Sequence, residues 1–167
     1  MIPHVKILCI PTLLLIFGFL PIQNQIQKVQ LSTLFLLFKL DRDQIDDFAV
    51  SKGYAIWPTR TLSPSLKIIS YLPKADAIYR SITLKYYNDN ILTETGYTTT
   101  DKLEYVSLKT QIKSKSYRFV SSEVIEDELT TYTYKSEKTP NYVIQISQSH
   151  NQETGDNHYT ITVQRMR

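Results

Sequence analysis

The residues best suited to chemistry in this chain are two histidines near the C-terminus, His150 and His158. They stand at the ends of the loop 151–157, which contains Glu153 and Asp156. If a hairpin turns within this loop, the two imidazoles face each other across neighbouring strands and could hold a transition metal with a carboxylate. The alternative is a pair of exposed histidines beside a loop whose carboxylates serve the turn. The sequence favours this alternative, so we expect no metal and no cofactor.

Other catalytic groups are scarce. Serines are plentiful, but none lies in a nucleophile elbow, and the sequence has no glycine-rich phosphate-binding loop. Among the four glycines, Gly53 fits a helix end, and Gly96 and Gly155 fit strand or turn positions. The acidic stretch Glu126-Asp-Glu128 fits a turn better than a pair of catalytic carboxylates. These patterns argue against an enzyme.

Tyrosine is the residue type that stands out, with 12 tyrosines against six phenylalanines. Several tyrosines lie in strand-like segments rich in Thr, Ser and Lys. Tyrosine offers a large contact area and a hydrogen bond, which is why interfaces enrich it, although Tyr and Thr also suit half-exposed strands that bind nothing. Strand alternation predicts that six residues share one open sheet face and bind a partner there: Thr83, Lys85, Tyr87, Thr130, Tyr132 and Tyr134.

A short helix with defined ends precedes the first of these strands. Asp41 can cap its first turn, and Gln44, three residues later, can complete a capping box. At the other end, Gly53 can adopt the left-handed conformation that closes a helix. Ile45 and Phe48 give the helix one narrow apolar face. We therefore expect this helix to lie on a sheet.

After Gly53 the apolar pattern changes from helical to alternating. Pro58 is expected to end the first strand, and Asn88-Asp-Asn90 to form a tight turn. Short connections between successive strands predict an antiparallel sheet. The four expected strands are Tyr54–Trp57, Leu66–Leu72, Tyr79–Tyr87 and Ile91–Thr99.

A second copy of this order begins at Asp101. Glu104 stands three residues after Asp101, which predicts another capping box. A helix over 101–116 is expected to follow, and then four strands. Tyr54 and Tyr117, the first strand residues of the two halves, are 63 positions apart, which fits an internal duplication. The four strands are expected at Tyr117–Ile125, Leu129–Tyr134, Tyr142–Ser147 and Tyr159–Val163.

The expected fold class is therefore α+β, built from two tandem units that cover 27–100 and 101–167. Each unit has one or two short helices packed on a four-stranded antiparallel sheet. The apolar run 30–40 favours a helix buried nearly all round, between the Asp41 helix and the sheet. The alternative for this run is a membrane-facing segment, against which Lys39 argues.

Residues 1–26 are expected to be a signal peptide. An apolar run from Ile7 to Ile22 follows Lys6 and is shorter than the roughly 20 residues of a membrane span. The following residues lack the small side chains of a usual cleavage site, so an uncleaved N-terminal anchor is the alternative. We expect a secreted or periplasmic protein, or one anchored to a membrane by its N-terminus.

Composition narrows the partners of the remaining chain. The single cysteine, Cys9, lies in the expected leader, so the other roughly 140 residues have no disulfide. Residues 1–26 contain one basic residue and no acid, which leaves 18 Lys and Arg against 16 Asp and Glu. Because these charges are interspersed, a nucleic-acid partner is not expected. Membrane contact is expected only through the N-terminal segment.

Tandem units of one helix and four strands resemble the beta-lactamase-inhibitor-protein fold. The helix exit Ser-Lys-Gly-Tyr54 is also similar to that of many small exported bacterial proteins. The resemblance covers about Gln30 to the C-terminus, without the disulfides of that family, and it implies a binding role. The sequence therefore favours an exported, non-enzymatic binding module for another protein or envelope component. The alternative is an envelope-associated structural protein held by its N-terminal segment.

Overall fold

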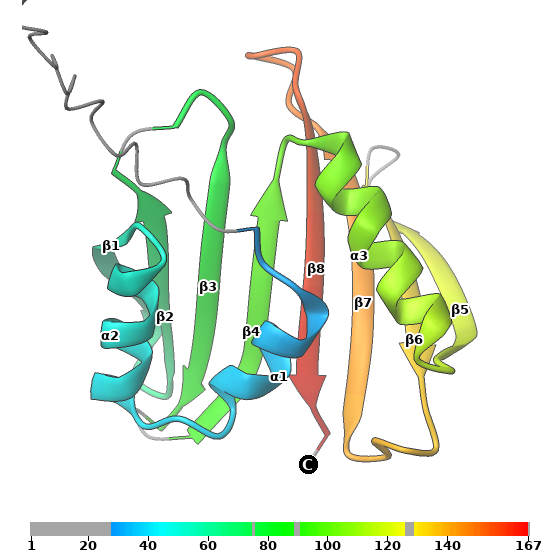
Figure 1. Ribbon diagram of the computed structural model, residues 1–167, viewed down its shortest axis with the longest axis horizontal. Coiled ribbons are helices and arrows are strands. Elements are labelled where there is room, and N and C mark those ends of the chain that lie inside the picture. The colour runs from blue at the N-terminus through cyan, green and yellow to red at the C-terminus, as the bar shows by residue number, and fades with distance from the viewer. Residues whose placement is uncertain (1–27, 75, 89–90, 126–128, 167) are drawn as a thin grey trace, which may run out of the picture.

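The computed structural model describes residues 28–74, 76–88, 91–125 and 129–166. The segment expected to be a signal peptide or anchor lies outside the described residues. None of the described helices is both long enough and apolar enough to cross a membrane. The elements, in chain order, are α1 (Leu31–Leu37), α2 (Arg42–Ser51), β1 (Tyr54–Ser63), β2 (Leu66–Pro73), β3 (Arg80–Tyr87), β4 (Ile91–Thr99), α3 (Lys102–Ser114), β5 (Arg118–Ile125), β6 (Leu129–Lys135), β7 (Tyr142–His150) and β8 (Asn157–Arg165) (Figure 1).

All eight strands form one antiparallel sheet in the order β1-β2-β3-β4-β8-β7-β6-β5. The strands fall into two groups of four, β1 to β4 and β5 to β8, which join where β4 pairs with β8. The α+β class and the antiparallel pairing predicted from the sequence are confirmed. The two groups share one continuous sheet.

The three helices lie on the same face of this sheet (Figure 1). One transverse row on that face runs through Tyr71, Ile82, Tyr97, Ile161 and Ile146, and all five side chains are at most 1% exposed. The core therefore lies between the helices and this side of the sheet. We call the other side the open face, because no helix of the described residues covers it.

Helix α2 begins and ends as its sequence predicts. The Asp41 carboxylate accepts the backbone N–H of Gln44 at 2.9 Å, and the Gln44 side chain accepts the N–H of Asp41 at 3.0 Å. This reciprocal pair is the predicted capping box. Gly53 follows the C-cap with φ 87°, a conformation that costs little only without a Cβ.

Helix α3 differs from its prediction at its N-terminus. Asp101 accepts the N–H groups of Leu103 and Glu104, but the Glu104 side chain is buried in the core, so the second capping box is wrong. At the other end, Ser116 takes a left-handed conformation, with φ 63°. A serine therefore stands where the first unit uses a glycine.

Helix α1 is shorter than the apolar run that predicts it, and it lies elsewhere. It contacts β4, β8 and α3, so its predicted position between α2 and the sheet is wrong. The N–H of Leu31 donates to Gln111 of α3 at 2.9 Å, and Thr95 of β4 donates to the Leu34 carbonyl at 3.0 Å. These two bonds fix α1 over the middle of the sheet (Figure 1).

Strand β1 continues through Pro58 to Ser63, so the predicted end at Trp57 is wrong. An edge strand tolerates proline because its outer N–H groups have no partner strand. The pairing with β2 shifts between Trp57 and Arg60 and again between Thr61 and Ser63. These irregularities accommodate Pro58 without ending the strand.

Candidate binding surface

The six residues predicted to share a binding face lie on two different faces. Thr83 pairs with Ser70 and Gly96, and Thr83, Lys85 and Tyr87 all lie on the open face, opposite to Ile82. In contrast, Tyr132 pairs with the buried residue Ile146. This register places Thr130, Tyr132 and Tyr134 on the helix face, so their predicted place beside Thr83, Lys85 and Tyr87 is wrong.

The physical reason is that tyrosines, rather than aliphatic residues, make the apolar face of β6. Tyr132 and Tyr134 are half-buried and pack against the core. The Tyr134 ring also meets Phe119 edge to face, with centroids 6.0 Å apart. Alternation relative to Leu129 alone predicts the opposite face, because Leu129 is the first residue of the strand and is only half-buried.

Small polar side chains cover the centre of the open face. A row across all eight strands follows directly from the register: Trp57, Ser70, Thr83, Gly96, Thr162, Gln145, Thr133 and Ser121. At its middle, Gly96 leaves a shallow space between Thr83 and Thr162. A Cβ there would stand 3.8 Å from each of these two side chains. The middle of the face is therefore low and uncharged.

Larger side chains gather on the open face of the first four strands. Tyr87 lies opposite Leu66 and Ile91, and the pairing partners of Ile68 are Arg60 and Lys85. Trp57 is 57% exposed and Ile91 is 51% exposed. We define the open-face patch as Trp57, Arg60, Ile68, Lys85, Tyr87 and Ile91. Sequence reasoning missed Arg60 because the first strand was expected to end at Pro58. It also missed Trp57 and Ile68, which lie within expected strands but whose neighbours on the face are set by the strand pairing.

Charge on the open face is concentrated in one transverse row. The row runs Arg60, Ile68, Lys85, Glu94, Gln164, Val143, Lys135 and Arg118. It carries four cationic side chains and one carboxylate, Glu94, whose Oε2 lies 3.4 Å from Lys85 Nζ. Since the exposed ends of this row are Arg60 and Arg118, the open face presents net positive charge along one line.

The helix face contains an ionic network centred on the buried carboxylate of Glu104, which is 3% exposed. Glu104 accepts hydrogen bonds from Arg80 Nη2 at 2.8 Å, from the Tyr97 hydroxyl at 2.7 Å and from Thr99 at 3.2 Å. Arg80 also pairs with Asp76. The hydrogen bond to Glu104 raises the pKa of Arg80 above its ordinary value, and burial raises the pKa of Tyr97. Both pKa shifts favour a charged Arg80 and a protonated Tyr97, so the network serves structure.

The sequence contains a signal for this network. Glu104, Leu108 and Ile112 recur at four-residue intervals, and all three are buried on one face of α3. An acid in such a series belongs to the buried stripe and requires a buried cation, here Arg80. A related pair occurs on α2, where Asp46 accepts the Tyr71 hydroxyl at 2.5 Å.

The two histidines do not face each other. His150 pairs with Asn157 in the hairpin, and His158 pairs with Ser149, so the imidazoles lie on opposite faces of the sheet. His158 instead lies 5.2 Å from the Tyr79 ring, between centroids. A metal held jointly by the two histidines is inconsistent with this register. Across the described ranges, His, Cys, Asp and Glu do not form any group of three that could hold a metal.

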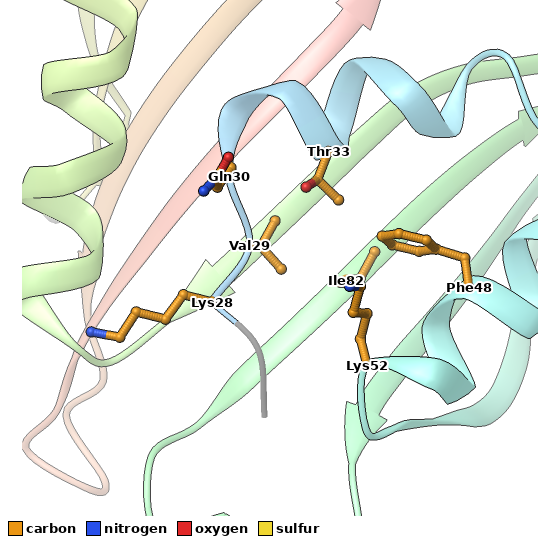
Figure 2. A pocket seen from close by; sticks show the side chains of 7 residues that line it. All are labelled: Lys28, Val29, Gln30, Thr33, Phe48, Lys52 and Ile82. Atoms are coloured by element: carbon orange, nitrogen blue, oxygen red, sulfur yellow. The ribbon is translucent and has the colours of Figure 1, made fainter. Parts of the chain in front are cut away.

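A pocket of about 260 Å³ lies where α1 begins, between α2 and β3 (Figure 2). Val29, Phe48 and Ile82 give it apolar walls. Its two lysines do not converge: Figure 2 shows Lys28 extending away from Phe48, while Lys52 Nζ lies 5.6 Å from the Phe48 ring centroid. This is a gap between packed elements rather than a site with focused polar groups.

Comparison of the chain with protein-family models, with curated proteins and with solved structures gives no match.

Proposed function

We propose that this chain is a non-enzymatic binding module that recognises another protein through the open face of its sheet. The observation that carries the proposal is the open-face patch, in which an exposed tryptophan and an arginine lie on β1 and a tyrosine lies on β3, with Ile68 of β2 between these strands. Energetically dominant residues of protein interfaces are enriched in these three types. Their clustering supports a role in recognition more strongly than scattered exposed residues would.

The open-face patch combines apolar contact with positive charge. Ile68 and Ile91 lie beside Tyr87, Arg60 and Lys85 in the register. Buried arginine and aromatic anchors surrounded by small polar contacts make an effective protein interface. The Thr, Ser and Gln side chains of the central row would form the polar surround.

The charge of the face supports one class of partner. Four cations against one carboxylate in the transverse row favour a protein surface that presents carboxylates. The other rows of the face carry mainly Ser, Thr, Gln and the aromatic residues, and the charged residue Glu123 among them is acidic. The face therefore lacks the broad basic area of a nucleic-acid binder. The proposed partner is therefore a folded protein with an acidic patch.

The proposal includes export from the cytoplasm. It is motivated by the apolar run between Ile7 and Ile22 and by the absence of cysteine after Cys9. Mass spectrometry of the protein from its native envelope or medium should detect a new N-terminus between about Gln23 and Gln30. Recovery of the intact chain from the cytosol would contradict export, and an intact chain in membranes would favour the anchored alternative.

We also propose that the two groups of strands are a duplicated unit. Each group follows a helix with an aspartate N-cap, at Asp41 and at Asp101, and each helix ends in a left-handed residue, Gly53 or Ser116. The resemblance to beta-lactamase-inhibitor-protein-like binding proteins depends on this tandem order. Superposition of 41–100 on 101–166 in an experimental structure should align all four strands; a mismatch in strand order would contradict the duplication.

The test of the function compares partner capture by matched variants of the full chain. Trp57→Ala and Tyr87→Ala each remove an aromatic anchor, and Arg60→Glu reverses a charge. Leu103→Ala is the control, because Leu103 is 76% exposed on α3, on the other side of the sheet. Cross-linked capture from the native envelope fraction identifies candidate partners, and the affinity of each purified pair is then measured.

We expect the two aromatic variants and the charge reversal each to raise the dissociation constant by about tenfold or more, as loss of an interface anchor does. The control should bind as wild type does. A captured protein that binds the wild type and all three open-face variants equally would overturn the proposal.

A further inference from the structure

The outer edge of β5 is unprotected. Within the described part of the chain, this terminal strand pairs only with β6, so its other edge presents backbone donors and acceptors that no described strand pairs. Three large apolar side chains of β5 are more than half exposed: Phe119 at 56%, Val120 at 51% and Val124 at 64%. A long exposed apolar edge strand is a template for pairing with another strand, and this edge is separate from the open-face patch.

The opposite edge of the sheet is less suited to pairing. Strand β1 contains Pro58, which has no N–H to donate, and its register with β2 shifts twice. Strand β5 contains no proline and pairs regularly with β6 from Ser121 onward. A strand that adds to this sheet is therefore expected at β5.

The charges on β5 are arranged for self-pairing. Arg118 and Glu123 stand near the two ends of the strand, opposite Lys135 and Thr131 of β6, so both lie on the open face. An antiparallel two-fold pairing of two β5 strands about residues 120 and 121 places Arg118 of each copy opposite Glu123 of the other. Opposite charges directly across antiparallel strands are stabilising.

The apolar side chains agree with the same register. Phe119 pairs with Tyr134, and Val124 pairs with Thr130, which places both on the helix face. In the two-fold pairing, Phe119 of one copy lies diagonal to Val124 of the other, within reach of an aromatic side chain. The shift in register between Phe119 and Ser121 occurs in both copies, so the two bulges meet at the two-fold axis and the residue counts remain equal.

Within one chain, Arg118 has weak ionic partners. Its pairing neighbour in β6 is the cation Lys135, and its contact with Glu137 spans 3.7 Å between side chains that are 84% and 89% exposed. Exposed pairs of this kind contribute little to stability. A carboxylate from a second copy would relieve the repulsion between Arg118 and Lys135.

We infer that the protein forms a symmetric dimer by antiparallel pairing of β5 with β5 of a second copy, held in register by two Arg118–Glu123 ion pairs. Each sheet then continues into the other, with the helices of both copies on the same side. The contact consists of one strand from each copy, so a dissociation constant of about 10 to 100 µM is expected.

The test is sedimentation velocity of the full chain over about 1 to 300 µM, with charge-reversal variants of β5. Arg118→Glu and Glu123→Arg should each weaken dimerisation by about tenfold, because each places like charges opposite each other twice. The double variant, with both charges exchanged, restores the pairs and should dimerise within about threefold of wild type. Arg60→Glu, at the other sheet edge, is the matched control and should not change dimerisation.

Folding and other modes of association are controlled in the same design. Arg118→Glu places a carboxylate opposite Lys135 within the chain, so its weaker dimer cannot be ascribed to a destabilised strand. Every variant keeps the N-terminal residues, so any association through those residues would be the same in the wild type and in each variant. A wild type that stays monomeric at the highest concentration, or a double variant no better than the single variants, overturns the inference.

Discussion

Gly53 and Ser116 have the same place in the two halves of the chain. Each follows the C-cap of a helix and each has positive φ, 87° at Gly53 and 63° at Ser116. Each directly precedes a tyrosine, Tyr54 or Tyr117. A left-handed residue therefore turns the chain from helix to strand at both places, but only the first site has the residue type that suits it.

The first prediction concerns Gly53→Val. A β-branched residue resists the left-handed conformation, so the free energy of unfolding should fall by about 1 kcal/mol or more. Thermal and urea unfolding measure the change. An unchanged melting temperature would contradict the role of Gly53 as the helix terminator.

The second prediction is the reverse change at Ser116. Ser116→Gly removes the strain of a side chain in the left-handed region, although it also makes the unfolded chain more flexible. We expect a net gain of about 0.5 kcal/mol in unfolding free energy. Ser114→Gly, inside the last turn of α3, is the control and should destabilise by about 0.5 to 1 kcal/mol. Equal effects at both positions would argue against the cap.

Local sequence patterns predicted where helices begin and end better than they predicted where each element packs in the fold. The capping box at Asp41 and the glycine exit depend on residues close in sequence, so both are confirmed. The position of α1 depends on a distant hydrogen bond from Leu31 to Gln111, and nothing in 30–40 encodes it. Strand β1 continues past Pro58 because it is an edge strand of the sheet, and the sequence near Pro58 does not show that position.

In the candidate site, too, local patterns placed some residues correctly and failed where strand register decides the face. Alternation placed Thr83, Lys85 and Tyr87 correctly, because buried Ile82 and Leu84 mark the inner face of β3. It failed for β6, where the inner face consists of half-buried tyrosines that local pattern cannot distinguish from exposed ones. The register of β6 with β7 decides that face, and register is a long-range property.

The third prediction compares two neighbouring residues of β6. Tyr132 packs against the core and Thr133 lies on the open face. Tyr132→Ala should lower the unfolding free energy by about 2 kcal/mol through lost packing, whereas Thr133→Ala should cost less than about 1 kcal/mol. Urea unfolding of both variants measures the difference. A larger loss of unfolding free energy in Thr133→Ala than in Tyr132→Ala would mean that Thr133 faces the helices and Tyr132 the open face.

The fourth prediction concerns the buried network of α3. Glu104→Gln leaves Arg80, which is 8% exposed, with Asp76 as its one ionic partner among the described residues. Removing one member of a buried ion pair typically costs about 3 to 5 kcal/mol, so the variant should unfold at much lower urea concentration. Leu103→Ala, beside it on the exposed face of α3, should remain within about 0.5 kcal/mol of wild type. If the two variants lower the unfolding free energy equally, Glu104 does not anchor the helix.

The last prediction is a loss of stability at alkaline pH. Burial raises the pKa of Tyr54 and of Tyr105, each to about 12, whereas an unfolded tyrosine has a pKa of about 10. Between these values the folded state binds more protons than the unfolded state, so the free energy of unfolding falls as pH rises. The contribution of each tyrosine is complete below about pH 10 and is lost as pH rises through about 12.

Tyr105→Phe tests this assignment. The variant keeps the ring that stacks on Tyr159 at 4.5 Å between centroids, but it removes the ionisable hydroxyl. Between about pH 10 and 12, the unfolding free energy of the variant should fall less steeply with pH than that of the wild type. The difference is about 1.4 kcal/mol per pH unit, the effect of one proton. Tyr54→Phe should act likewise, and Leu103→Ala should leave the slope unchanged. If neither phenylalanine variant reduces the slope, groups other than these two buried phenols control alkaline unfolding.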